Sequence, residues 1–208
     1  MFDIPEIQEA IMHVLLSLVL LCILSLPIFA QNEHADHAGA TKLGAVHFPI
    51  SCGGKAQAEF DRAMALLHSF WYDEAEKTFA AIATAEPSCG MGWWGMAMSN
   101  YHPLWSPPTP GELRRGSEAS EKAARTGAKT QRERDYIAAI STFYHDASKL
   151  DHLTRVLAYR KSMGQLHQRY PEDTEGSILY ALSLVKQSPA SSEDVANQKE
   201  AARILTSI

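Results

Sequence analysis

The chain has 208 residues, 46% of them hydrophobic and 21% charged, and a formal net charge of −5. This balance excludes an intrinsically disordered chain. The negative net charge also argues against the basic surface of a nucleic-acid-binding protein. The length is sufficient for one ordinary domain with a sizeable hydrophobic core.

An apolar segment without Lys, Arg, Asp or Glu runs from Ile11 to Ala30. It predicts a signal segment of residues 1–30 that is cleaved after Ala30, although the residues before it are acidic rather than basic. A translation start at Met12 would explain that departure. The alternative is an uncleaved membrane anchor of residues 11–30, because about 20 apolar residues span a bilayer. Either interpretation exports the rest of the chain, to the periplasm or as a secreted protein, and only the second places it at a membrane.

Residues 31–54 are expected to form an extended N-terminal segment, which contains the motif "NEHADHAG". Imidazole and carboxylate groups such as those of His34, Asp36 and His37 bind Zn²⁺ or Cu²⁺. The cluster lies in a polar tail without fixed surroundings, which favours an unstructured terminus over a metal site.

Two cysteines, Cys52 and Cys89, follow the apolar segment and would reach an oxidising compartment, where disulfides persist. We predict a disulfide between them. The alternative is a pair of small buried thiols that do not meet.

Helical periodicity dominates from Lys55 onward, and the pattern repeats along the chain. A set of large, small, large and large residues recurs, and its small member is always alanine, which lets a neighbouring helix approach closely. The sets are Phe60, Ala63, Met64 and Leu67; Trp94, Ala97, Met98 and Tyr101; Tyr136, Ala139, Ile140 and Phe143; and Ile178, Ala181, Leu182 and Val185.

The helices that come after these sets repeat as well. Their shared positions are Ala75, Phe79, Ile82 and Pro87; Tyr159, Met163, Leu166 and Pro171; and Ala201, Leu205 and Ile208. The second unit lacks this set, and its polar helix is expected to pack through Leu113, Ala119 and Ala123. Together the sets predict an all-α chain of helix pairs over residues 55–208. The units are 55–88, 89–129, 130–171 and 172–208, and the last is expected to be incomplete because it stops short of its proline.

The spacing of Trp94, Ala97, Met98 and Tyr101, and of Ala75, Phe79, Ile82 and Pro87, resembles the tetratricopeptide repeat (TPR) pattern W-x2-L-G-x2-Y, A-x3-F and P. The resemblance implies a right-handed α-solenoid of helix-turn-helix repeats. A period of 42 residues between later units also suits other helical-pair solenoids, such as HEAT repeats.

The stretches "KLGAVHFPISC", "ALLHSFWYDEAEKTF" and "EPSCGMGWWGMAMSNYHPLW" look like those of exported bacterial TPR proteins of unassigned activity, which continue with further repeats. This resemblance implies a scaffold whose first helices line a concave surface that binds a protein or peptide partner. The sequence contains no glycine-rich phosphate loop, nucleophile elbow, CxxCH or HExxH motif, so we expect neither a cofactor nor catalysis. Charged stretches such as "DEAEK" and "QRERD" are expected to be solvated helix surfaces.

His68 and His102 lie 34 residues apart, at equivalent places on adjacent first helices. Two imidazoles so placed suggest an alternative function, a metal-binding protein or metal-dependent enzyme with its site near this pair. The competing interpretation is that each histidine ends its helix and donates to free carbonyls.

Trp93 and Trp105 lie near the proline-rich loop "HPLWSPPTPGE". They are candidates to rim a groove for a peptide partner, because exposed aromatic residues often anchor partners. The alternative is that they pack the loop onto the helices.

Overall fold

Eight α-helices make up the described part of the computed structural model, which covers residues 43–104, 106–185 and 192–208. They are α2 (Gly54–His68), α3 (Tyr72–Ala85), α4 (Gly90–Ser99), α5 (Pro110–Thr126), α6 (Gln131–Tyr144), α7 (His152–Arg169), α8 (Thr174–Leu184) and α9 (Ser192–Leu205). No strand occurs among these residues. The expected signal or anchor segment, the cluster of His34, Asp36 and His37, and Trp105 lie outside the described residues.

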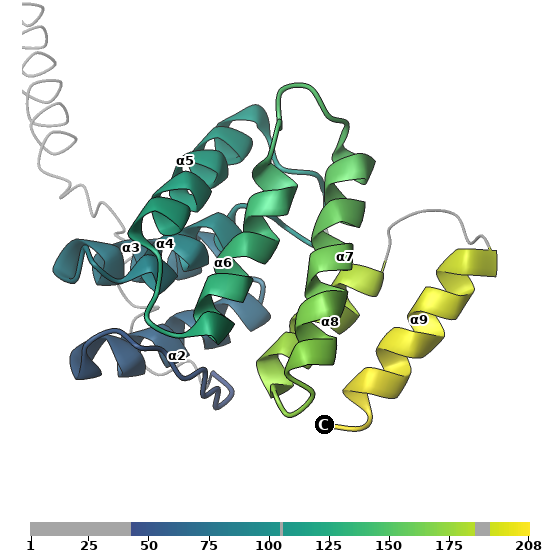
Figure 1. Cartoon of the computed structure of the whole chain (residues 1–208), viewed down its shortest axis with the longest axis horizontal. Coiled ribbons are helices and arrows are strands. Elements are labelled where there is room, and N and C mark those ends of the chain that lie inside the picture. Colours follow the sequence, from purple (N-terminus) through teal and green to yellow (C-terminus); the bar gives the residue numbers. More distant parts are fainter. Residues whose placement is uncertain (1–42, 105, 186–191) are drawn as a thin grey trace, which may run out of the picture. The chain divides into compact units, whose positions relative to one another are not determined.

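The helices pack sequentially in pairs, and each helix contacts the next one along the chain. Figure 1 shows this arrangement for α6 and α7, which lie side by side. The first helices of successive pairs also touch, α2 against α4 and α4 against α6. The predicted all-α fold is confirmed, and each unit expected from the sequence contains one helix pair.

The alanines that recur in the first helices are buried between the helices. Ala63, Ala97, Ala139 and Ala181 are each at most 1% exposed. In the first three pairs the large residues of the same sets are buried as well, with Trp94, Tyr136 and Phe143 among the largest fully buried side chains. The repeat therefore marks the faces through which the helices pack.

The fourth pair departs from the expected pattern. Leu205 and Ile208 are 42% and 54% exposed, whereas Ile204 is 2% exposed and takes the core position. The prediction that Leu205 and Ile208 are core residues is wrong, because α9 packs through Ala201 and Ile204, one residue closer together than expected, and ends at Leu205. The backbone of α8 packs closely against α7 and α9 among the described helices, and Ile178, Leu182 and Val185 are only partly buried.

The polar helix α5 packs through its small residues. Ala119 and Ala123 are buried and Leu113 packs against the core, as predicted. Gly116 was not predicted: a Cβ there would collide with the ring of Tyr144, whose hydroxyl donates to the Ala97 carbonyl at 2.8 Å. Small residues let the backbone of α5 approach the neighbouring helices closely, and α5 can therefore pack against them although it has few large apolar residues.

Cys52 and Cys89 form a disulfide, as predicted. The bond ties the segment before α2 to the start of α4, and it indicates an oxidising compartment outside the cytoplasm. None of the helices in the described ranges is both long and apolar enough to cross a membrane.

We predict that the Cys52→Ser, Cys89→Ser variant loses about 4 kcal/mol of unfolding free energy, because the bond closes a loop with a sequence separation of 37. Urea unfolding of the oxidised protein and the variant measures the loss. Thiol labelling with mass spectrometry is the companion measurement. Modification of Cys52 and Cys89 without prior reduction would contradict the disulfide.

Candidate functional site

An extended segment of residues 43–53, here termed the docked segment, lies against the first helices of three pairs. Four of its N–H groups donate to side chains at 2.7–2.9 Å: Phe48 to Asp61, Ile50 to Gln57, Ser51 to Glu133, and Gly53 to Glu86. Its carbonyls at Phe48 and Pro49 accept from Gln57 at 2.8 Å and Arg132 at 3.0 Å. Side chains on or next to the helices therefore form the hydrogen bonds that a neighbouring strand would otherwise supply to this backbone.

Phe48 anchors the docked segment. Its fully buried ring has centroid distances of 5.3 Å to Phe60 of α2, 5.5 Å to Trp94 of α4 and 4.9 Å to Tyr136 of α6. The guanidinium carbon of Arg132 lies 4.3 Å from the same ring. One side chain from outside the helices thus contacts the first helix of three successive pairs.

Glu133 belongs to the stretch expected to be a solvated surface, and that expectation is wrong. It is 1% exposed, because its carboxylate accepts from Ser51 of the docked segment and caps α6 together with Thr130. Burial alone would raise its pKa, but the hydrogen bonds from Ser51 and Thr130 outweigh burial and lower it. Glu133 therefore binds the segment as a charged acceptor.

Arg132 links the docked segment to the fourth pair. Its Nε and Nη2 donate to the carboxylate of Asp173 at 2.6 and 3.0 Å, and Tyr136 donates to the same carboxylate at 2.8 Å. Asp173 also caps α8 by accepting from the N–H of Gly176. Burial would raise the pKa of Asp173, but the hydrogen bonds from Arg132 and Tyr136 lower it overall.

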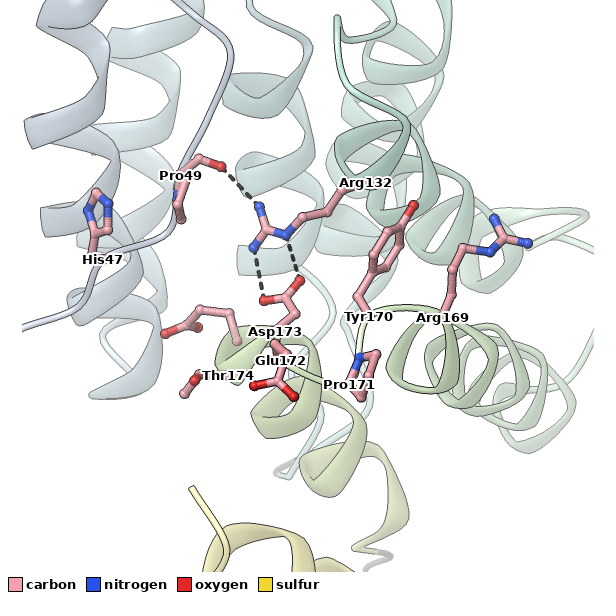
Figure 2. Close-up of a pocket in the computed structure, with 10 residues that line it drawn as sticks. His47, Pro49, Arg132, Arg169, Tyr170, Pro171, Glu172, Asp173 and Thr174 are labelled. Carbon is pink, nitrogen blue, oxygen red and sulfur yellow. Dashed lines mark hydrogen bonds and ion pairs between the residues drawn. The ribbon is translucent and has the colours of Figure 1, made fainter.

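A cavity of about 610 Å³ lies beside the Arg132–Asp173 ion pair. Figure 2 shows Arg132 between Pro49 and Asp173, with the connection between α7 and α8 forming another wall. The lining residues are His47, Pro49, Arg132, Arg169, Tyr170, Pro171, Glu172, Asp173, Thr174 and Glu175. The cavity is therefore bounded by the docked segment on one side and by the start of the fourth helix pair on the other.

Most charged groups that line this cavity are already paired. Besides Arg132 with Asp173, Arg169 donates to Asp135 at 2.7 Å and His47 lies 3.0 Å from Asp61. Glu175 lies 2.7 Å from Nε2 of His68, across 107 residues of sequence. Glu172 is exposed and has no hydrogen bond or ion pair with another described residue, so its carboxylate remains available to a ligand.

The two candidate metal ligands have separate partners. Nε2 of His68 contacts Glu175, whereas the His102 ring lies 4.4 Å from the ring of Tyr72, tilted by 31°, with Nε2 at 3.8 Å from Glu112. No group of three or more potential metal ligands occurs in the part of the chain that the structure describes. His68 and His102 therefore have different partners among the described residues, and their role as metal ligands stays a prediction.

Of the two candidate aromatic residues of a partner groove, Trp93 is partly buried on α4. Its ring packs against the core and lies 4.5 Å from the Lys122 ammonium of α5. Trp105 is outside the described residues. The contacts of Trp93 fit a role in packing α4 against α5, and its role in binding a partner stays a prediction.

Sequence reasoning expected an extended segment at residues 31–54, but it missed the docking of residues 43–53 on the helices and the Arg132–Asp173 pair. Phe48 and Pro49 stand out within the stretch "KLGAVHFPISC", yet nothing in it identifies contacts that lie more than 80 residues away. Comparison with protein-family models, curated proteins and solved structures finds no match to this chain. The site is therefore interpreted from its geometry.

We predict that Phe48→Ala lowers the unfolding free energy by about 3–5 kcal/mol, because it leaves a cavity between three helices. Urea unfolding measures the loss. Leu153→Ala on α7 is the matched control, since that side chain is 45% exposed, and should cost less than about 0.5 kcal/mol. Equal, small effects of both variants would contradict a buried anchor.

Asp173→Asn should cost about 3 kcal/mol at neutral pH, because it leaves Arg132 without its charged partner. The folded pKa of Asp173 is lowered, so its contribution is present above the ordinary value near 4 and disappears as the pH falls through the folded pKa. The difference between wild type and variant should therefore shrink in acid. Urea midpoints from neutral pH to below pH 4 measure this, with Glu172→Gln as the control. A difference that stays constant into acid would refute the interpretation.

Proposed function

We propose that the protein is an exported, periplasmic or secreted TPR-like scaffold, a right-handed α-solenoid, that binds an extended segment of a protein or peptide partner at the cavity beside the docked segment. The proposal keeps the resemblance of the helix pairs to tetratricopeptide repeats as its basis for the finer fold. Binding needs no cofactor and no catalytic group.

The docked segment is the observation that carries this proposal. In it, an extended part of the chain lies on the first helices of the pairs. Side chains of these helices bind its backbone, and the ring of Phe48 fills a pocket between them. Peptide recognition commonly combines these two elements, backbone hydrogen bonds for affinity and side-chain pockets for specificity. A face that holds a segment of its own chain in this way has the chemistry to hold one from a partner.

The cavity adds a place for that partner. Its volume of about 610 Å³ falls within the range of ordinary ligand sites, and Glu172 supplies a carboxylate without a described partner. Tyr170 and Pro171 add apolar surface on the same wall. The arrangement favours a partner segment that places a Lys or Arg side chain against Glu172.

The test is selection of peptides from a random-sequence library on the purified exported protein. The enriched peptides should carry a basic residue, and Glu172→Lys should weaken them about tenfold, or about 1.4 kcal/mol, because it reverses the available charge. Titration by fluorescence anisotropy measures the affinities. Glu118→Lys, on the exposed face of α5, makes the same charge change away from the cavity and should leave them unchanged.

Failure to enrich any sequence would overturn the proposal. So would peptides that bind wild type, Glu172→Lys and Glu118→Lys equally, since their binding would then not involve this cavity.

A further inference from the structure

A second cavity, of about 360 Å³, lies where the connection between α2 and α3 meets the connection between α4 and α5 and the first turn of α5. No described residue lines both this cavity and the cavity beside the docked segment. It therefore presents a separate set of groups, and an inference about it does not rest on the proposed function.

Aromatic rings form one side of this second cavity. Phe70 and Trp71 are 38% and 41% exposed, although both are large and apolar. Phe70 meets Tyr72 edge to face at 6.3 Å, and the His102 ring lies against Tyr72 at a tilt of 31°. Exposed aromatic rings gathered at a concave surface are characteristic of binding sites rather than of ordinary surface.

The backbone around these rings is unusual. Phe70 and His102 have positive φ angles of 61° and 51°, a region that residues other than glycine seldom adopt. Such residues cost about 1–3 kcal/mol each and gather at functional sites. Two of the three non-glycine residues with positive φ in the described ranges line this one cavity. The backbone conformation that places these two rings at the cavity therefore lowers the stability of the fold.

Carboxylates form the rest of the lining, with Asp73 and Glu74 from the first turn of α3 and Glu112 from the first turn of α5. The described lining residues include no Lys or Arg, although two cations lie outside the lining: Lys77 contacts Glu74 at 2.7 Å, and Arg115, whose charge acts on Glu112, pairs with Glu76. Burial would raise the pKa of Glu112, but hydrogen bonds from Thr109 lower it overall. The cavity is therefore negatively charged at neutral pH.

Aromatic faces and carboxylates together select one class of ligand. An anion is repelled by the carboxylates, and a neutral apolar molecule gains nothing from them. A bare metal ion would need three or more clustered ligand residues, and no such group occurs among the described residues. An alkylammonium group gains from both, by cation–π attraction to the rings and by charge attraction to the carboxylates.

We propose that the cavity lined by Phe70, Trp71, Asp73 and Glu112 binds an alkylammonium group. Two sources share this chemistry, a free quaternary ammonium compound and a lysine side chain of a partner. Binding is weak, in the range expected of one cation at a partly exposed site, and falls as the salt concentration rises.

The experiment follows the Trp71 indole signal and the backbone amide signals of residues 70–74 by NMR during titration of the exported protein. The probes are choline, its neutral isostere 3,3-dimethylbutan-1-ol, and the peptide acetyl-Gly-Lys-Gly-amide. Choline or the lysine peptide should shift these signals with saturation, and the isostere should not. The tighter of the two cationic probes identifies the source of the ligand.

Two variants connect binding to the lining. Asp73→Asn with Glu112→Gln should weaken cation binding about fivefold, and glutamine preserves the helix cap that Glu112 provides. Trp71→Ala should abolish binding while the protein still unfolds in one cooperative transition, since 41% of Trp71 is exposed and alanine keeps the backbone hydrogen bonds at this position. Glu118→Gln with Glu121→Gln, on the exposed face of α5, removes two charges away from the cavity and should bind as wild type does.

Two outcomes overturn the proposal. One is equal binding of choline and its isostere, which would make the cavity merely apolar. The other is the absence of saturable shifts with either cationic probe at tens of millimolar.

Discussion

The need to satisfy the backbone of the docked segment governs much of this structure. An extended chain buried against helices finds no ladder of hydrogen bonds, and each unsatisfied group would cost about 1–3 kcal/mol. Gln57, Asp61, Glu86 and Glu133 supply acceptors from their side chains. These residues occupy positions on or beside helices that would otherwise face water, so the segment and the helix surfaces beneath it depend on one another.

Burying the segment also brings charged groups out of water, and the structure pairs them over long distances in sequence. Arg132 meets Asp173 across 41 residues, and His68 meets Glu175 across 107. The first contact ties the start of the fourth helix pair to α6, and the second ties α8 to α2 of the first pair. They also define the candidate site, because Glu172 is left as the charged lining residue without a described partner.

Local and periodic features were predictable from the sequence. The buried alanines, Trp94 and the Cys52–Cys89 bond follow from repeat spacing and from an even number of exported cysteines. The alignment of repeats put Leu205 at a packing position because it assumes the same spacing in every unit. The helix α9 packs at a different spacing, through Ile204. Phe48 and Glu133 were missed for another reason: their partners lie far along the chain, and periodicity carries no information about such pairs.

The order in which a ribosome or a secretion channel delivers the chain makes the docked segment dependent on helices that are delivered later. Ser51 is synthesised 82 residues before its acceptor Glu133, so this hydrogen bond must wait until the first two helix pairs and the start of α6 have been delivered. Cys52 meets Cys89 much earlier, at a separation of 37. Oxidation therefore fixes the segment covalently before Arg132 and Glu133 are delivered, and the search for these later contacts begins from that covalent point.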